Sequence, residues 1–190
     1  MRLFVAIDVG DVVRAEAARV IQAISSKIEA VQTPPKIIWV KPNALHVTLR
    51  FIGEVADKAV PALCERLAPP IAMAPFAVEW RGLGVFPTAR QPRALWLGVV
   101  AGAAALGALE AEVTRRLVGT VEPESRPLLP HLTLGRVKMA GAGMDWPMIL
   151  RAHDVRGART PVDRVTLYRS QLSQRGPNYT GLVSAPLKLS

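Results

Sequence analysis

The sequence predicts an α+β fold with two similar halves in one domain that spans residues 1–190. The chain has 190 residues, of which 50% are apolar, and this is enough to bury a substantial core without disulfides. An expected order of strand, helix, strand and strand opens the chain and begins again near its middle. The tetrapeptide His-apolar-Thr-Leu occurs at residues 46–49 and at 131–134, so each half contains one copy.

The elements of the first half follow from apolar periodicity and from turn residues. Apolar residues recur at helical spacing after the first strand, and strand-like alternation lies on both sides of the turn at Pro42-Asn43. A second helical pattern stops before Pro69-Pro70. In order, we expect a strand over residues 1–8, a helix over 12–28, strands over 36–40 and 45–53, and a helix over 59–67.

The second half repeats this order without a low-complexity linker, which predicts that the halves share an interface. Strands over 76–85 and 94–100 lie on either side of the turn-rich segment 87–93. They are followed by a helix over 103–117, a strand over 128–137, the glycine-rich break 140–143, a short helix over 146–152, and strands over 162–169 and 179–187 joined by the loop 173–178.

Composition limits the classes of function. The net charge of +9 favours an anionic partner such as nucleic acid, although many proteins from GC-rich genomes are simply rich in arginine. The single cysteine, Cys64, excludes an intrachain disulfide, matches no zinc spacing, and is expected to be a small buried residue. No apolar stretch has the length of a signal-peptide core or a membrane span, so we expect a cytoplasmic protein with no membrane partner.

The two histidine motifs present an imidazole and a hydroxyl on one face of a strand. Because side chains alternate along a strand, His46 shares a face with Thr48, and His131 with Thr133. Imidazole has a reference pKa of about 6.5, so one histidine can be neutral while the other is protonated. Such a pair can act as general base and general acid in phosphoryl transfer, with the hydroxyls donating to phosphate oxygens.

A structural role is the alternative for each motif taken singly, because threonine favours strands in any case. Repetition of the motif beside a turn-forming proline, Pro42 in one copy and Pro130 in the other, favours function. Two histidines without clustered carboxylates or thiolates make a poor metal site, so we expect neither a metal nor a cofactor. The third histidine, His153, has no threonine after it and is expected to be structural or on the surface.

Over nearly its whole length the chain resembles the 2H phosphoesterases, and among them the RNA 2′,3′-cyclic phosphodiesterases, also called 2′-5′ RNA ligases. Besides the two histidine motifs, the resemblance rests on Arg2 to Asp8, Trp39 to Val55, Gly82 to Pro87, Arg93 to Val99, Arg126-Pro127 before Pro130-His131, and Leu167 to Ser170. The chain departs from the usual pattern at Asn43-Ala44, where many relatives have Glu-Asn, and at Leu128-Leu129, where an aromatic residue is more usual. These changes affect only the expected entry to the cleft.

The resemblance implies a bilobal fold of two antiparallel-rich β-sheets with outer helices, related by a pseudo-two-fold axis, with the active site in the central cleft. It also implies hydrolysis of a terminal 2′,3′-cyclic phosphate to a 2′-phosphate and, in reverse, ATP-independent joining of RNA ends through a 2′-5′ linkage. By position, the catalytic set is His46, Thr48, His131 and Thr133. The expected partner is RNA with cyclic phosphate ends.

Three residues are candidates for substrate binding. Arg136, five residues after His131, matches an arginine that contacts the phosphate in relatives; the alternative is a solvated arginine at a strand end. Strict alternation would put Arg136 on the opposite face, so we expect a β-bulge at Gly135 to turn it back. Phe51, at the same offset after His46, is placed to stack on a base, or else belongs to the core. Arg50 is expected to line or rim the cleft, as are Arg90, Arg93 and Arg169.

Several alternatives stay open at the level of sequence. The chain is either an RNA end-processing enzyme or a nucleotide- or RNA-binding module that has kept the cleft without physiological turnover. If it is an enzyme, its biological reaction is either hydrolysis or ligation. The matched histidine pair favours an enzyme. We expect a monomer, although the sequence does not determine the oligomeric state. His46 is favoured as the acid and His131 as the base, because Arg136 beside His131 would disfavour its protonation.

Overall fold

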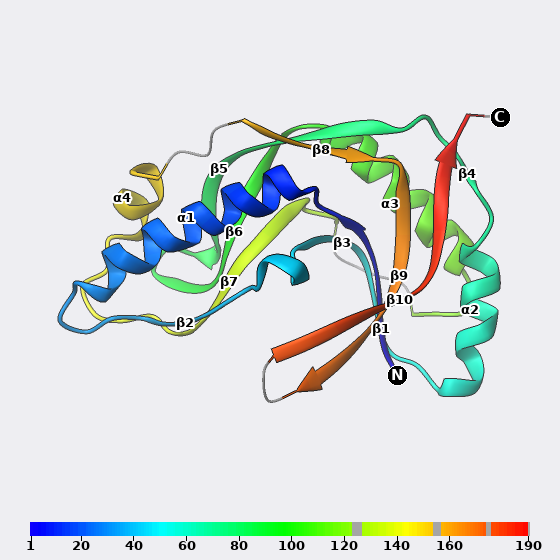
Figure 1. The fold of residues 1–190 in the computed structure, drawn as a ribbon. Helices are drawn as coiled ribbons and strands as arrows, with labels where there is room; N and C mark the ends of the chain where they lie inside the picture. Colours follow the sequence, from blue (N-terminus) through cyan, green and yellow to red (C-terminus); the bar gives the residue numbers. More distant parts are fainter. Residues whose placement is uncertain (123–126, 154–156, 174–175, 190) are drawn as a thin grey trace.

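A computed structural model describes the whole chain except residues 123–126, 154–156, 174–175 and 190. It has two five-stranded sheets that lie next to each other, and all strand pairs within them are antiparallel except one at an edge (Figure 1). The first sheet has the order β3 (His46–Glu54), β1 (Arg2–Asp8), β9 (Arg164–Ser173), β10 (Gly176–Lys188) and β4 (Ile71–Ala72). The second has the order β2 (Lys36–Trp39), β7 (His131–Met139), β6 (Gln91–Ala101), β5 (Phe76–Thr88) and β8 (Ala158–Val162).

Helices cover the outer faces of the two sheets, which confirms the α+β class. α1 (Asp11–Glu29) lies over the second sheet and contacts β8, whereas α3 (Ala103–Leu117) contacts β3 and α2 (Val60–Leu67) contacts β10 of the first sheet (Figure 1). α4 (Trp146–Arg151) packs on β5, and short 3₁₀ turns form η1 (Pro42–Ala44) and η2 (Asp57–Ala59). Within the described residues, none of these helices combines the length and the apolarity that crossing a membrane requires.

The amphipathic pattern of α1 explains why a helix forms there. Its buried residues recur at spacings of three and four, which place them on one side of a helix. They are Val13, Ala17, Val20, Ile24 and Ile28. The helix expected over residues 12–28 is therefore confirmed, and α3 has the bounds expected from the sequence.

The two sheets do not divide the chain at its midpoint, as two contiguous half-domains would. β2 comes from the first half of the sequence but pairs with β7 of the second sheet, and the C-terminal hairpin β9–β10 pairs with β1. The sequence analysis also missed β8, although this strand contributes a fully buried hydroxyl: Thr160 accepts a hydrogen bond of 2.8 Å from the indole of Trp80. Each half of the chain thus completes the sheet of the other.

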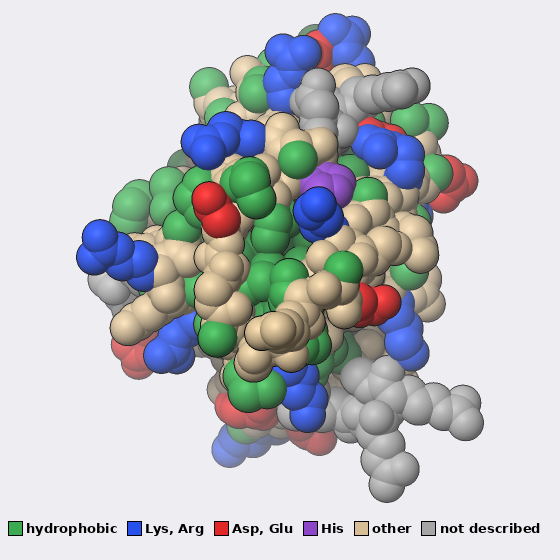
Figure 2. Space-filling view, turned by 90° about the vertical axis from the view of Figure 1, so that its left-hand side faces the viewer, with side chains coloured by type: hydrophobic (Ala, Val, Ile, Leu, Met, Phe, Trp, Pro, Cys, Tyr) green, Lys and Arg blue, Asp and Glu red, His purple; other side chains and the backbone are tan. Residues whose placement is uncertain are grey.

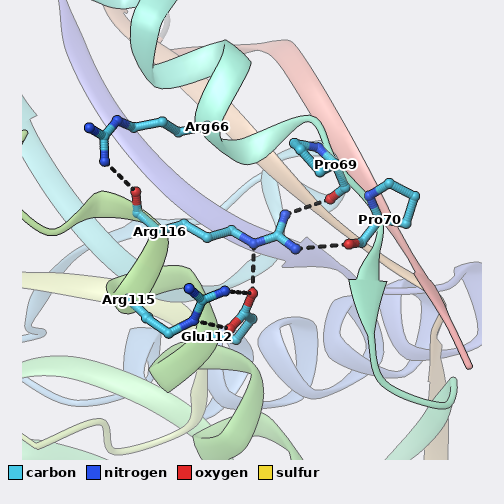
Figure 3. Close-up of polar contacts among 6 residues, drawn as sticks. All are labelled: Arg66, Pro69, Pro70, Glu112, Arg115 and Arg116. Carbon is cyan, nitrogen blue, oxygen red and sulfur yellow. Dashed lines mark hydrogen bonds and ion pairs between the residues drawn. The ribbon is translucent and has the colours of Figure 1, made fainter. Parts of the chain in front are cut away.

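A polar network fixes the end of α3 against the segment between α2 and β4 (Figure 3). Glu112 accepts hydrogen bonds from Arg115 at 2.7 and 2.8 Å and from Arg116 at 2.7 Å. Arg116 also donates to the carbonyl oxygens of Pro69 at 2.5 Å and Pro70 at 2.8 Å. The hydrogen bond from Arg115, followed by that from Arg116 and their charges, lowers the pKa of Glu112 to about 2.

Candidate active site

His46 is the first residue of β3 and follows directly on η1. Its Nδ1 lies 2.8 Å from the carbonyl oxygen of Ala44. A carbonyl oxygen can only accept a hydrogen bond, so Nδ1 carries a proton and donates it. The other ring nitrogen, Nε2, is then the one that remains to accept or donate a proton in a reaction.

His131 begins β7 in the same way. Its Nδ1 donates to the carbonyl oxygen of Leu129 over 2.7 Å, again two residues earlier in the chain. Both histidines are therefore held in one tautomer by equivalent backbone contacts, and both keep Nε2 for chemistry. The sequence did not predict these contacts, because the acceptors are main-chain oxygens and carry no signature of residue type.

The threonines lie on the same faces as their histidines. The intervening residues Val47 and Leu132 are completely buried in the core, whereas Thr48 and Thr133 are half-buried on the opposite face. β3 and β7 are the strands through which the two sheets contact each other. The structure thus gives each of the two adjoining strands an imidazole followed by a hydroxyl on the side away from the core.

Aromatic rings surround the two imidazoles. The ring of Phe4 lies 4.8 Å from that of His46, and Tyr179 meets His46 edge-on at 5.0 Å. On the second sheet, Phe86 meets His131 edge-on at 5.1 Å. These neighbours come from other strands and were not predicted from the sequence.

Burial and charge act on His46 in opposite directions. Burial among its neighbours lowers the pKa of His46 below 6.5, and it outweighs the hydrogen bond to the Ala44 carbonyl and the charge of Asp8, which raise it. The positive charges of Arg136 and His131 lower the pKa further. Both of these charges belong to β7 of the second sheet. The neutral imidazole is therefore favoured at His46.

A β-bulge lies in β7 next to the predicted position. Thr133 pairs with Trp96, but Gly135 pairs with Leu95, which leaves Leu134 as the extra residue. Leu134 and Gly135 are both buried, and Arg136 after them is exposed. The alternation therefore reverses at the bulge and returns Arg136 to the face of the histidine, as the sequence analysis expected.

The same bulge occurs in β3, at the corresponding place after the first motif. Thr48 pairs with Ala6 and Arg50 with Val5, so Leu49 is the extra residue. The burial pattern of β3 matches that of β7 over the first six residues. This repetition is the clearest trace of the pseudo-two-fold relation in the backbone.

The bulge separates Phe51 from Arg50. Phe51 turns to the side of His46, is 44% exposed, and has the guanidinium of Arg2 5.0 Å from the centre of its ring. Arg50 turns toward the core instead: it is 3% exposed and donates to the carbonyl oxygen of Glu122 over 2.5 Å. The structure therefore does not bring Arg50 to the face that carries His46, contrary to the expectation from its place in the sequence.

The other candidate cations lie on an exposed turn and strand end or on the far face of β9. Arg90 is exposed in the turn between β5 and β6, and Arg93 is exposed near the start of β6. Arg169 pairs with the buried Leu3, on the opposite face of its strand from Tyr168. Arg126 lies outside the described residues. Figure 2 shows Lys and Arg side chains at separate places on one face of the molecule rather than in one dense patch.

The remaining predictions concern His153, Cys64 and metals. His153 follows α4, where its ring contacts the carbonyl oxygen of Ile149 at 2.7 Å, and this suits the expected structural role. Cys64 is half-buried on α2. In the described part of the chain, no three His, Cys, Asp or Glu side chains come together as a metal site would need.

Comparison with known proteins agrees with this geometry. The sequence model of the LigT-like phosphoesterases matches residues 12–96. The chain is 39% identical over 145 residues to an RNA 2′,3′-cyclic phosphodiesterase of Aeropyrum pernix, covering 75% of this chain and 82% of the relative. It is 30% identical over 180 residues to the enzyme of the same name from Thermotoga maritima, with 94% and 91% covered.

Solved structures give the same class. The crystal structure of TT0787 of Thermus thermophilus has a TM-score of 0.75 at 29% identity, with 98% of each chain covered. That of E. coli LigT complexed with 3′-AMP has a TM-score of 0.68 at 25% identity, with 98% of this chain and 96% of that chain covered. Fold and site therefore define a LigT-like phosphoesterase of the 2H type. The chain belongs to the family of the RNA 2′,3′-cyclic phosphodiesterases, which are phosphoric diester hydrolases.

Proposed function

We propose that this protein opens the 2′,3′-cyclic phosphate at the end of an RNA and leaves a 2′-phosphate, with His46 and His131 as its acid and base and without a metal. The repeated anchoring of the two imidazoles carries the proposal. Each Nδ1 is tied to a main-chain carbonyl, so each Nε2 is available for proton transfer, and β3 and β7 adjoin. Relatives named RNA 2′,3′-cyclic phosphodiesterase support the substrate.

In the proposed mechanism His46 is the base and His131 the acid, the reverse of the assignment favoured from the sequence. His46 is the more suitable base because burial and the charge of Arg136 both favour its neutral form. Its Nε2 takes a proton from the attacking water while His131 protonates the departing 3′ oxygen. Water supplies the new P–O bond, the bond to O3′ breaks, and the phosphate stays on O2′.

Thr48 and Thr133 are proposed to donate hydrogen bonds to the non-bridging oxygens of the phosphate, where negative charge accumulates. Arg136 is proposed to add its charge from the same face of β7, since the bulge exposes it there. Fixed donors and charges of this kind stabilise a transition state because they need no rearrangement during the reaction. Phe51, exposed on the histidine side of β3, is proposed to stack on the terminal base.

The same groups would also catalyse transfer to RNA. A 5′-hydroxyl can replace water as the nucleophile, which gives ATP-independent 2′-5′ joining of RNA ends with the same base and acid in the same roles; they exchange roles only when this linkage is cleaved again. Hydrolysis is proposed as the main reaction, because water is present at far higher concentration than RNA ends.

The test measures turnover of an oligonucleotide with a 2′,3′-cyclic phosphate end, in the presence of EDTA. We expect His46→Ala and His131→Ala each to lose at least about 10²-fold in kcat, and the double variant to be little worse than either. His153→Ala is the matched control and should keep full activity. Tight binding without a 2′-phosphate product would favour the RNA-binding module, and more than a tenth of wild-type activity in either single variant would refute the two-histidine mechanism.

The pH dependence gives a second readout of the same proposal. The rate should be bell-shaped, because low pH protonates the base and high pH deprotonates the acid. Since the pKa of His46 is lowered from 6.5, the acidic limb of kcat/KM should lie below pH 6.5. An acidic limb above that value would contradict His46 as the base.

A further inference from the structure

Asp8 is the neighbour of His46 on the adjacent strand. The two residues are paired directly in the antiparallel register of β1 and β3, at the end of both strands. Side chains paired in this way lie on one face with their Cβ atoms about 5 Å apart. Both also line one small hollow beside the catalytic face, together with the rings of Phe4 and Tyr179. The carboxylate and the imidazole therefore share one local environment.

Tyr168 holds this carboxylate in place from the next strand, β9. Its hydroxyl donates to Asp8, with distances of 2.7 Å and 2.8 Å to the two carboxylate oxygens. The ring of Tyr168 is stacked on that of Phe4 at 5.4 Å, which restricts its movement. Burial, followed by the hydrogen bond to Asp8, raises the pKa of Tyr168 to about 12, so the phenol remains a donor throughout the working pH range.

Among the residues that the structure describes, the strand beside His131 offers no equivalent carboxylate. The residue paired with His131 on β6 is Gly98. A Cβ atom there would lie 2.9 Å from the carbonyl oxygen of Arg81 and 3.1 Å from the ring of Trp96, so the backbone leaves no room for a side chain. Asp8 thus departs from the pseudo-two-fold relation: it stands beside the histidine that we propose as the base, and the strand paired with His131 has Gly98 at the corresponding position.

We propose that Asp8 and Tyr168 are a positioning pair for His46: the phenol fixes the carboxylate, and the carboxylate keeps one negative charge beside the imidazole. This inference rests on the proposed function insofar as it assigns the pair a use in catalysis. A base must be neutral before the reaction but must also accept a proton during it. Asp8 stabilises the imidazolium that forms when water is deprotonated, and so offsets the opposing effects of burial and of Arg136.

The hydrogen bond to the Ala44 carbonyl raises the pKa of His46 most, and among the charged groups Asp8 is the one that adds to this stabilisation. The charge of Asp8 raises the pKa of His46, whereas the charges of Arg136 and His131 on β7 lower it. Tyr168 and Tyr179 face it from β9 and β10 as neutral phenols. η1 contributes the carbonyl of Ala44 and the uncharged Asn43. Farther out, the charge of Arg14 lowers the pKa of Tyr168, and the charge of Asp8 raises the pKa of Arg164. Both arginines would therefore attract the Asp8 carboxylate if Tyr168 no longer held it.

NMR titration of the histidine side chains tests the pair directly, because the chain has three histidines and each signal can be assigned by replacing one of them. Asp8→Asn should lower the pKa of His46, and Tyr168→Phe should lower it less, since the freed carboxylate moves toward the arginines. Asp8→Glu should restore most of the wild-type value. Asp11→Asn, which removes the same charge from a fully exposed position nearby, should leave it unchanged.

Catalysis supplies the second readout. In Asp8→Asn the acidic limb of kcat/KM should move to lower pH with a fall of at least about tenfold in kcat, while KM changes little. A purely structural role of Asp8 would instead lower the fraction folded without moving the limb. An unchanged His46 titration in folded Asp8→Asn would overturn the inference even if turnover is confirmed. Absence of turnover in the wild type would refute the proposed function alone, because the titration does not depend on it.

Discussion

Replacement of Gly135 by alanine tests whether the bulge in β7 positions the active site. A Cβ atom at this position would lie 2.7 Å from Cε3 of Trp39 and 2.9 Å from Cγ2 of Ile37, both on β2. Contacts below 3 Å are not tolerated, so either the strand β2 or the bulge must shift. Gly135 is immediately followed by Arg136, which therefore loses its defined place beside the histidines.

The expected size of the effect follows from the packing. Added volume in a filled site costs about 1 to 3 kcal/mol, which for a chain of this size lowers Tm by roughly 2 to 12 °C. Displacement of Arg136 by about an ångström is expected to lower kcat/KM by ~10 to 100-fold in addition. The loss of activity should remain at temperatures where the variant is fully folded.

Urea unfolding and turnover of the cyclic phosphate substrate, measured on the same preparations, separate these effects. Gly107→Ala is the control, because this glycine lies inside α3 with no atom within 4 Å of an added Cβ. It should stabilise the protein by about 0.5 to 1 kcal/mol, since alanine favours the helix, and leave activity unchanged. If Gly135→Ala had unchanged stability and activity, the bulge would not position Arg136 as we argue.

Three further predictions concern other parts of the molecule. Glu112→Gln should destabilise the protein by about 1 to 2 kcal/mol at neutral pH, which is less than the full pKa shift implies because the Glu112 side chain is 23% exposed. This loss of stability should be fully present above pH 4.5 and should vanish as the pH falls toward 2. Equal losses at pH 7 and pH 3 in urea unfolding would contradict the prediction. Phe51→Ala should raise KM several-fold with kcat nearly unchanged, Phe51→Trp should keep the wild-type KM, and an unchanged KM in the alanine variant would exclude stacking. Arg136→Gln should reduce the slope of log affinity for single-stranded RNA against log salt concentration by roughly 0.7. Arg90→Gln should reduce this slope only if the RNA also contacts the turn between β5 and β6. An unchanged slope in Arg136→Gln would show that Arg136 does not contact phosphate.

Much of this architecture was predictable because its signals are local. The period of apolar residues indicated α1 and α3, and the two histidine motifs indicated β3 and β7 with the right side chains on one face. The bulge in β7 could be predicted because strict alternation would have put Arg136 on the face opposite His131. Phe51 lies on the side of His46 for the same reason, because β3 has a bulge at the corresponding position.

The features that could not be predicted depend on contacts between distant segments or on the main chain. Arg50 was misplaced because the bulge that exposes Phe51 turns the preceding residue inward, where it meets the carbonyl of Glu122. The hydrogen bonds that hold Nδ1 of His46 and His131 could not be predicted, because their acceptors are main-chain carbonyl oxygens. The contact between Tyr168 and Asp8 joins residues 160 positions apart, and no spacing in the sequence indicates it.

The pseudo-two-fold relation explains what the two histidines share, and the departures from it explain how they can differ. In both motifs Nδ1 of the imidazole donates to the carbonyl oxygen two residues earlier, so the two histidines share one tautomer. A single displacement needs them unequal. The difference arises at corresponding positions on neighbouring strands: β1 carries Asp8 where β6 carries Gly98, and β7 carries the charge of Arg136 where β3 carries Phe51. If this reasoning is correct, Asp8→Asn and Arg136→Gln should shift the pKa of His46 in opposite directions, and the double variant should titrate between the two single ones.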